Sequence, residues 1–206
     1  MSMTSSHPTS SSDVTSPIEH LPLNRRAATD SMLMAKAANI RLACFDVDGT
    51  LTDGRLFLDS EGHEMKAFHV HDGQGLVLLR QAGIEVAFIT ARLSPVAVHR
   101  AHELKVRVHI GVKDKLACVR ELCAELDIGL DAVSFMGDDL PDLTAMRAVG
   151  LSVAPANAHA FTAAQAQLRT QAKAGDGAAR ELCDLLLAAQ GGFDEPMAKP
   201  PTGELS

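Results

Sequence analysis

The stretch CFDVDGT, residues 44–50, leads from an apolar segment into two aspartates separated by one residue, and then into a glycine and a threonine. Carboxylates this close together raise each other's pKa and resist removal from water. Such a pair at the end of a buried strand is unfavourable unless a cation or a reaction uses it. If Asp46 and Asp48 are functional, the rest of the sequence must supply that cation and that reaction.

Apolar runs alternate with helical patterns on both sides of this stretch. The strand candidates are residues 41–47, 85–90, 106–110, 132–137 and 150–154, and the helical patterns cover 73–82, 94–104, 113–127, 139–148, 158–166 and 177–189. This alternation predicts an α/β fold, a doubly wound parallel sheet with right-handed crossovers and helices on both faces. Residues 54–73 break the alternation, and the turn signal DSEGHE predicts a β-hairpin insertion there.

The two ends of the chain differ in composition from this α/β segment. Residues 1–35 are rich in Ser, Thr and Pro, and residues 191–206 contain repeated Gly and Pro. We expect disordered tails in both places, with a short helix over DSMLMAKAANI leading into the domain. A chain of 206 residues, 46% of them hydrophobic, has enough apolar surface for one core, which we place at residues 36–190.

Charge and composition exclude several classes of partner. The 19 basic and 26 acidic residues give a net charge of −7, and the absence of Trp and Tyr removes most base-stacking residues, so no nucleic-acid partner is expected. No run reaches the ~20 apolar residues of a membrane span, and the N-terminus lacks the pattern of a secretory signal. The four cysteines form no CxxC pair, which favours reduced thiols in a cytoplasmic protein.

Polar residues stand where the predicted strands end. Asp46 and Asp48 follow the first strand, Thr90 ends the second, Asp138 follows the fourth, and Lys115 opens a helix. In open parallel sheets, ligands bind beyond the carboxyl ends of the strands, at a switch point in strand order. We therefore expect these side chains to converge on one edge of the sheet.

This set of side chains suits phosphoryl transfer. Mg²⁺ takes one or two protein carboxylates together with phosphate oxygens, so Asp46 and Asp138 could hold it. A carboxylate can attack phosphorus to form an aspartyl-phosphate, while Thr90 and Lys115 neutralise phosphoryl oxygens. Asp48 would protonate the leaving oxygen and later activate water. A bound cation would also allow an anionic substrate in an acidic protein.

DVDGT, Thr90, Lys115 and GDDLPD, in this order, resemble the four motifs of the haloacid dehalogenase superfamily of aspartate-nucleophile phosphatases. Over residues 36–190, segments such as DVDGTLTDG, VGLSVAPANAH and GAARELCDLLLAAQG are similar to its capless branch of 3-deoxy-D-manno-octulosonate 8-phosphate phosphatases. That family hydrolyses the sugar-acid phosphate through an aspartyl-phosphate, in lipopolysaccharide inner-core biosynthesis. The resemblance implies a Rossmann-like fold, dependence on Mg²⁺, and a homotetramer in which the hairpin of one subunit helps to cover a neighbour's site.

The resemblance also implies roles for individual residues. The catalytic set is Asp46, Asp48, Thr90 and Lys115, and the metal-ligating set is Asp46, Asp48, through its backbone carbonyl, and Asp138. The implied substrate-binding residues are Asp48, Glu64, Lys66, His71, Thr90, Ala91, Arg92 and Lys115.

Three positions depart from the family pattern. His71 and Asp176 stand where the family has Arg, and Ala91 stands where it has Gly. The loss of two cationic positions leaves open another sugar acid, such as an acylneuraminate 9-phosphate. A non-catalytic assembly module is a third possibility, although the intact reaction residues speak against it. His69 and His71 alternate on the expected strand and would point the same way, but no third residue completes a metal site.

Other residues near the motifs have two interpretations. Lys113 competes with Lys115 as the cation before the helix, and we prefer Lys115 from the motif alignment. Asp139 is either a helix N-cap or a support for the metal. Asp142 is expected to orient Lys115 or a metal-bound water rather than to bind the metal directly.

Overall fold

The computed structural model describes residues 30–191, so the tails expected over 1–29 and 192–206 lie outside the described residues. Helix α2 (Ser31–Ala38) corresponds to the short helix expected before the domain, and it starts inside the segment expected as the first tail. The Asp30 side chain caps this helix by accepting hydrogen bonds from the backbone N–H groups of Met32 and Leu33. Because α2 packs against the last helix, it is part of the folded unit.

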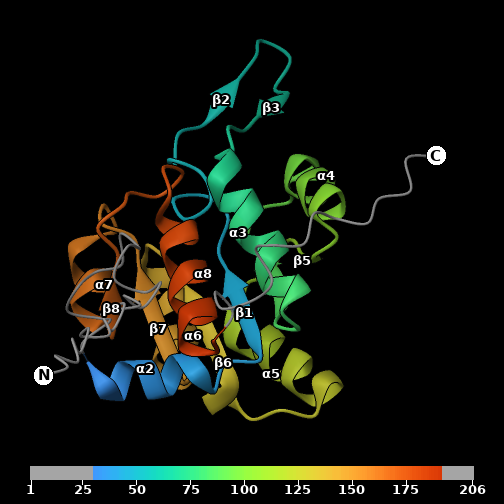
Figure 1. Cartoon of the computed structure of the whole chain (residues 1–206). Helices are drawn as coiled ribbons and strands as arrows, with labels where there is room; N and C mark the ends of the chain where they lie inside the picture. Colours follow the sequence, from blue (N-terminus) through green and yellow to red (C-terminus); the bar gives the residue numbers. More distant parts are fainter. Residues whose placement is uncertain (1–29, 192–206) are drawn as a thin grey trace, which may run out of the picture.

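A parallel sheet of six strands forms the centre of the fold, which confirms the predicted fold class (Figure 1). Its strands are β1 (Leu42–Phe45), β4 (Glu85–Ile89), β5 (Arg107–His109), β6 (Val133–Met136), β7 (Leu151–Ala154) and β8 (Leu168–Arg169). The spatial order β5-β4-β1-β6-β7-β8 places β1 between the two halves. The switch point in strand order therefore lies at the carboxyl end of β1. Strand β8 is a two-residue edge strand in a polar segment that showed no strand pattern in the sequence.

Helices cover both faces of the sheet. The core of one face includes residues of α2, α3 (Val70–Gln81), α4 (Pro95–Leu104) and α8 (Ala178–Ala189). The core of the other face includes α5 (Lys115–Leu126) and α6 (Leu143–Ala148), with α7 (Ala160–Gln165) packed at its edge. Two short 3-10 helices, η2 (Leu130–Ala132) and η3 (Leu140–Asp142), precede β6 and α6. Alternate residues of β1 enter the two cores, as the pleat of a strand requires. No helix among residues 30–191 is long and apolar enough to cross a membrane.

The segment DGQG at residues 72–75 brings α3 against α8. A Cβ atom on Gly75 would lie 2.9 Å from Cδ of Arg180 and 3.0 Å from Cβ of Cys183, so only glycine permits this approach. Buried Asp72 fastens the same pair of helices, because its Oδ1 accepts a hydrogen bond of 2.8 Å from the backbone N–H of Arg180. Gly75 thus serves the packing of α3 against α8.

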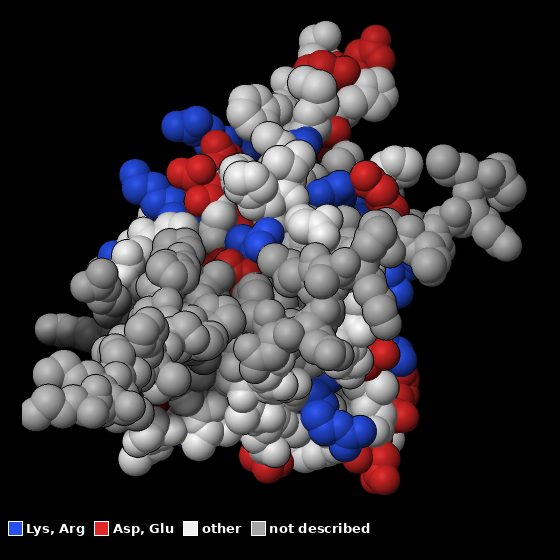
Figure 2. All heavy atoms as spheres, viewed as in Figure 1, with Lys and Arg blue, Asp and Glu red and all other residues white. Residues whose placement is uncertain are grey.

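The predicted hairpin insertion projects from the body of the molecule (Figure 1). Strands β2 (Phe57–Leu58) and β3 (Glu64–Met65) pair antiparallel, with Phe57 opposite Met65. Leu56, Phe57, Leu58 and Met65 are exposed large apolar residues. Acidic side chains gather at the hairpin tip in Figure 2, where Asp59 and Glu61 lie.

The second half of the insertion differs from the prediction. Helix α3 already starts at Val70, so residues 70–73 are helical rather than extended. His69 is the N-cap position and His71 lies in the first turn, and the expectation that they alternate on a strand was wrong. Asp72 explains the difference, because an acidic residue in the first turn favours a helix start and its carboxylate binds the backbone of α8.

Candidate active site

The loop after β1 turns sharply and brings Asp46 and Asp48 to the edge of the sheet. The Asp46 backbone N–H donates to the Met136 carbonyl at 2.9 Å and thereby extends the β1–β6 ladder by one bond. Beyond it, the Val47 carbonyl accepts hydrogen bonds from several N–H groups of the turn. Gly49 has a φ of +86°, and a Cβ atom there would lie 2.6 Å from Cγ of Asp138. Glycine is required because the loop passes directly against that carboxylate.

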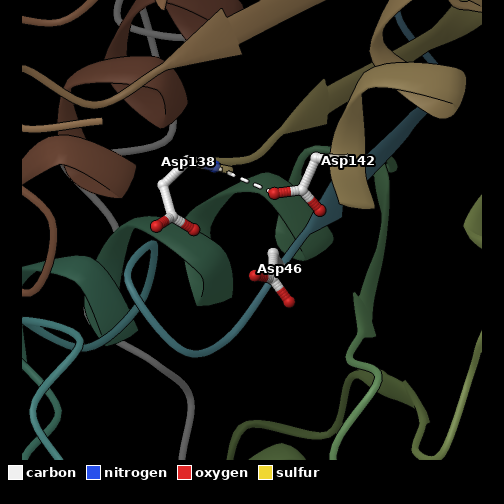
Figure 3. A group of neighbouring side chains, drawn as sticks. All are labelled: Asp46, Asp138 and Asp142. Atoms are coloured by element: carbon white, nitrogen blue, oxygen red, sulfur yellow. Dashed lines mark hydrogen bonds between the residues drawn. The ribbon is translucent and has the colours of Figure 1, made fainter. Parts of the chain in front are cut away.

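Three carboxylates meet at this edge (Figure 3). Oxygen atoms of Asp46, Asp138 and Asp142 lie within 4.8 Å of one another. Asp142 is held from both sides: its Oδ2 accepts a hydrogen bond of 3.0 Å from the Asp138 backbone N–H, and its Oδ1 lies 2.6 Å from Nζ of Lys115. The same Nζ lies 2.8 Å from Oδ1 of Asp46. We call Asp46, Asp138, Asp142 and Lys115 the acidic cluster.

Burial and mutual repulsion disturb the titration of this cluster. Burial raises the pKa of Asp46 to about 6, with a further increase from Asp142 that Lys115 partly offsets. Burial, together with the charges of Asp46 and Asp142, raises the pKa of Asp138 to about 7. Burial lowers the pKa of Lys115, but Asp46 and Asp142 outweigh it and the pKa is raised. One lysine opposes three carboxylates, so the cluster fits a further cation, and its oxygen donors are those that Mg²⁺ prefers.

Thr90 and Arg92 follow β4, the strand that lies next to β1 in the sheet. Thr90 is buried, and its Oγ1 accepts a hydrogen bond of 3.2 Å from the backbone N–H of Arg92. The Ala91 side chain is exposed beside them. The Arg92 side chain reaches toward the hairpin, where Nη2 lies 2.7 Å from Oε1 of Glu64 and Nε lies 3.8 Å from Oδ2 of Asp48.

The base of the hairpin delivers two charged side chains to Asp48 of the same chain. Lys66 is almost completely buried, and its Nζ donates to Oδ1 of Asp48 and, at 3.0 Å, to Oε1 of Glu64. Oε2 of Glu64 accepts a hydrogen bond of 2.9 Å from the hydroxyl of Ser94. Ser94 was not among the site residues predicted from the sequence. The pattern Ser-Pro at a helix start could have marked it as an N-cap, but nothing in the pattern links it to Glu64.

The structure also separates the interpretations left open by the sequence. Lys113 is exposed, whereas Lys115 lies in the cluster, which agrees with the motif alignment. Asp139 caps η3 in a capping box with Asp142, as one interpretation held. His71 is exposed and meets the ring of His69 edge-on, with centroids 5.0 Å apart. Among the described contacts, none joins His71 to the acidic cluster. Asp176 is exposed just before α8.

The doubly wound sheet, with an aspartate pair after its first strand and a lysine and further aspartates beside it, defines a hydrolase of the haloacid dehalogenase type. A family model described as haloacid dehalogenase-like hydrolase matches residues 108–182. The chain is 44% identical over 164 residues to the 3-deoxy-D-manno-octulosonate 8-phosphate phosphatase KdsC of Escherichia coli (strain B / BL21-DE3), covering 79% of this chain and 87% of that protein. The chain belongs to the family of 3-deoxy-D-manno-octulosonate 8-phosphate phosphatases.

Solved structures agree with this assignment. A hypothetical protein from Xanthomonas campestris is 56% identical, with a TM-score of 0.83 over 86% of this chain and 98% of that one. The 3-deoxy-D-manno-octulosonate 8-phosphate phosphatase of Moraxella catarrhalis, in complex with magnesium ion, phosphate ion and KDO, is 43% identical. Its TM-score is 0.76 over 78% of this chain and 93% of that chain.

Proposed function

We propose that this protein is a Mg²⁺-dependent phosphatase that hydrolyses 3-deoxy-D-manno-octulosonate 8-phosphate to 3-deoxy-D-manno-octulosonate and phosphate. It is a phosphoric monoester hydrolase of lipopolysaccharide inner-core biosynthesis. The observation that carries the proposal is the acidic cluster at the carboxyl edge of the sheet, in a chain 44% identical to phosphatases of this name. The magnesium, phosphate and KDO in the Moraxella catarrhalis relative support the same chemistry.

Asp46 is the proposed nucleophile and Asp48 the proposed general acid and base. An oxygen of Asp46 attacks phosphorus while Asp48 gives its proton to the departing sugar oxygen, so the P–O bond to the sugar breaks as the aspartyl-phosphate forms. Asp48 then takes a proton from the water that attacks this phosphorus, which releases phosphate and restores Asp46. Oδ2 of Asp48 suits this role, because it is buried and no hydrogen bond among the described residues occupies it.

The proposed metal ligands are the carboxylates of Asp46 and Asp138 and the backbone carbonyl of Asp48. Mg²⁺ bound there would neutralise the nucleophile and a phosphoryl oxygen. Asp142 is already committed to Lys115 and to the Asp138 backbone, so it orients both rather than binding the metal. Thr90 and Lys115 are the proposed donors to phosphoryl oxygens, a role favoured by their burial at the sheet edge.

The proposed sugar-binding residues are Glu64, Lys66, His71, Ala91 and Arg92. A panel of sugar-acid phosphates, assayed for phosphate release with Mg²⁺, tests the function. The 8-phosphate of 3-deoxy-D-manno-octulosonate should give the highest kcat/KM, and an acylneuraminate 9-phosphate is the comparison substrate. A higher kcat/KM for the acylneuraminate would overturn the substrate assignment. Phosphate release by the Asp46→Asn variant above a few per cent of the wild-type rate would overturn the mechanism instead.

The proposed assembly is a homotetramer in which hairpins meet. An isolated two-stranded hairpin is marginal in water, and this one exposes Leu56, Phe57, Leu58 and Met65. Light scattering should give a mass near four chains, and Phe57→Ser with Met65→Ser should give smaller species. A wild type that is monomeric and fully active would refute the assembly. A cytoplasmic location is also proposed, supported by the buried free cysteines at 44, 118, 123 and 183.

A further inference from the structure

The hydroxyl of Ser94 makes two hydrogen bonds of unequal quality. Ser94 is completely buried at the N-cap of α4, and its Oγ accepts from the Ala97 backbone N–H at 3.4 Å. The same Oγ donates to Oε2 of Glu64 at 2.9 Å. The capping bond is at the long end of hydrogen-bond distances, whereas the bond to the carboxylate lies within the normal range and is charge-assisted. The more favourable partner of Ser94 is therefore Glu64.

Glu64 connects Ser94 to both cations that face Asp48. Its Oε1 accepts from Nζ of Lys66 at 3.0 Å and from Nη2 of Arg92 at 2.7 Å. Burial opposes ionisation of Glu64, but hydrogen bonds from Lys66, Ser94 and Arg92 outweigh it and keep the pKa of Glu64 below its usual value. The carboxylate is thus charged and fixed at every oxygen. Its position determines where the two cations lie.

The two cations approach different oxygens of Asp48. Nζ of Lys66 donates to Oδ1, and Nε of Arg92 lies 3.8 Å from Oδ2, beyond hydrogen-bond distance. Lys66 has almost no freedom, because its side chain is 1% exposed. A chain of contacts therefore sets the orientation of the Asp48 carboxylate. Ser94 holds Glu64, Glu64 holds Lys66, and Lys66 holds Oδ1 of Asp48. Oδ2 is the oxygen left to exchange a proton.

We propose that Ser94 is a positioning residue for the protonation of the leaving group, acting through Glu64 and Lys66 on the orientation of Asp48. This inference rests on the proposed function, since it assumes Asp48 is the general acid of a phosphate monoesterase. Misorientation of a general acid slows departure of a poor leaving group, such as a sugar alkoxide. It has little effect on p-nitrophenyl phosphate, whose phenolate leaves without a proton.

The test compares kcat/KM for these two substrates in Ser94→Gly. Glycine is tolerated at N-caps at a loss of a few tenths of a kcal/mol relative to serine, so this change removes the bond to Glu64 with little effect on α4. We expect kcat and kcat/KM for the sugar-acid phosphate to fall together by about tenfold or more, with KM nearly unchanged, the effect of losing a hydrogen bond to a charged group. A rise in KM at unchanged kcat would instead mean that sugar binding was lost, and would overturn the proposal. The kcat/KM value for p-nitrophenyl phosphate should change by less than about twofold. Ser94→Ala should show the same split if the glycine variant is unstable.

Two controls separate positioning from stability. Asp30→Gly removes the N-cap of α2, far from the site in the chain, and should leave both kcat/KM values unchanged. In a Glu64→Gln background, Ser94→Gly should have much less further effect on the sugar-acid phosphate, because coupled residues are not additive. Equal losses for both substrates, full additivity, or no loss in either serine variant would overturn the proposal. If the wild type releases no phosphate from the sugar-acid substrate, the proposed substrate is wrong. The same split is then expected with the best alkyl phosphate of the panel.

Discussion

Replacing Lys115 by Met should destabilise the protein in proportion to the charge left uncompensated in the acidic cluster. The Lys115 side chain is 2% exposed, and its Nζ lies 2.8 Å from Asp46 and 2.6 Å from Asp142. Methionine preserves most of the side-chain volume, so the main loss is electrostatic. Removing one partner from a buried ion pair reduces the free energy of unfolding by about 3–5 kcal/mol. We expect a loss in this range at pH 8 in the presence of a chelator.

The loss should shrink as the pH falls. In the wild type, burial raises the pKa of Asp46 to about 6 although Lys115 opposes the shift, so the variant's Asp46 must have a higher pKa. At pH 8 the folded variant must either bury an unpaired Asp46 carboxylate or take up a proton there, and both lower its free energy of unfolding. At pH 5 Asp46 is protonated in both proteins. Each unit by which the pKa rises above the wild-type value adds about 1.4 kcal/mol to the difference at pH 8. This part of the difference is absent at pH 5.

Urea unfolding followed by far-ultraviolet circular dichroism measures this effect, since the chain has no Trp or Tyr for fluorescence. Lys113→Met is the matched control, because Lys113 is exposed two residues away and should change the free energy of unfolding by less than about 0.5 kcal/mol. Equal losses in the two variants, or a Lys115→Met loss that is the same at pH 5 and pH 8, would refute the charge-balance reasoning.

Three further outcomes are expected. Asp46→Asn should abolish phosphate release, because an amide cannot attack phosphorus, and residual turnover above a few per cent would count against the covalent route. Mg²⁺ should raise the melting temperature more at pH 8 than at pH 5.5, because Asp46 and Asp138, with pKa values of about 6 and about 7, must lose their protons before the metal binds. An equal rise at both pH values would contradict this. Gly49→Ala should lower stability by more than about 1 kcal/mol and weaken Mg²⁺ binding, because its φ is +86° and its Cβ would meet the Asp138 carboxylate; calorimetry with unchanged Mg²⁺ affinity would argue against that contact.

Local sequence patterns predicted the strands of the sheet and the residues that follow them, because these depend on the apolar or polar character of neighbouring residues. Strands β1, β4, β6 and β7 are mostly buried apolar runs, whereas β5 is half-buried. The residues after β1, β4 and β6 reach one edge because parallel strands end together. The choice between Lys113 and Lys115 came from the motif alignment, and the start of α5 explains why it agrees with the structure. Asp114 is the N-cap of α5, so Lys115 is the first residue of the helix and its side chain is buried.

Contacts between distant segments could not be predicted in this way. FHVHDG at residues 68–73 alternates like a strand, but Asp72 binds the backbone of Arg180, 108 residues further on, and the segment starts a helix. Strand β8 has only two residues, too few for a period to show. The bond from Ser94 to Glu64 joins a helix cap to a hairpin, and no periodicity relates the two.

The position of α8 has a consequence for the order in which the chain can fold during synthesis. This helix supplies Leu182, Leu185 and Leu186 to the core over one sheet face. Gly175, shortly before the helix, donates a backbone hydrogen bond to the Thr50 carbonyl in the loop that carries the proposed catalytic aspartates. A nascent chain that still has this segment inside the ribosome leaves α3 and β1 uncovered on that side. The loop that carries Asp46 and Asp48 acquires its last support only after α8 has left the ribosome, so in the growing polypeptide this loop is completed after every strand of the sheet has been made.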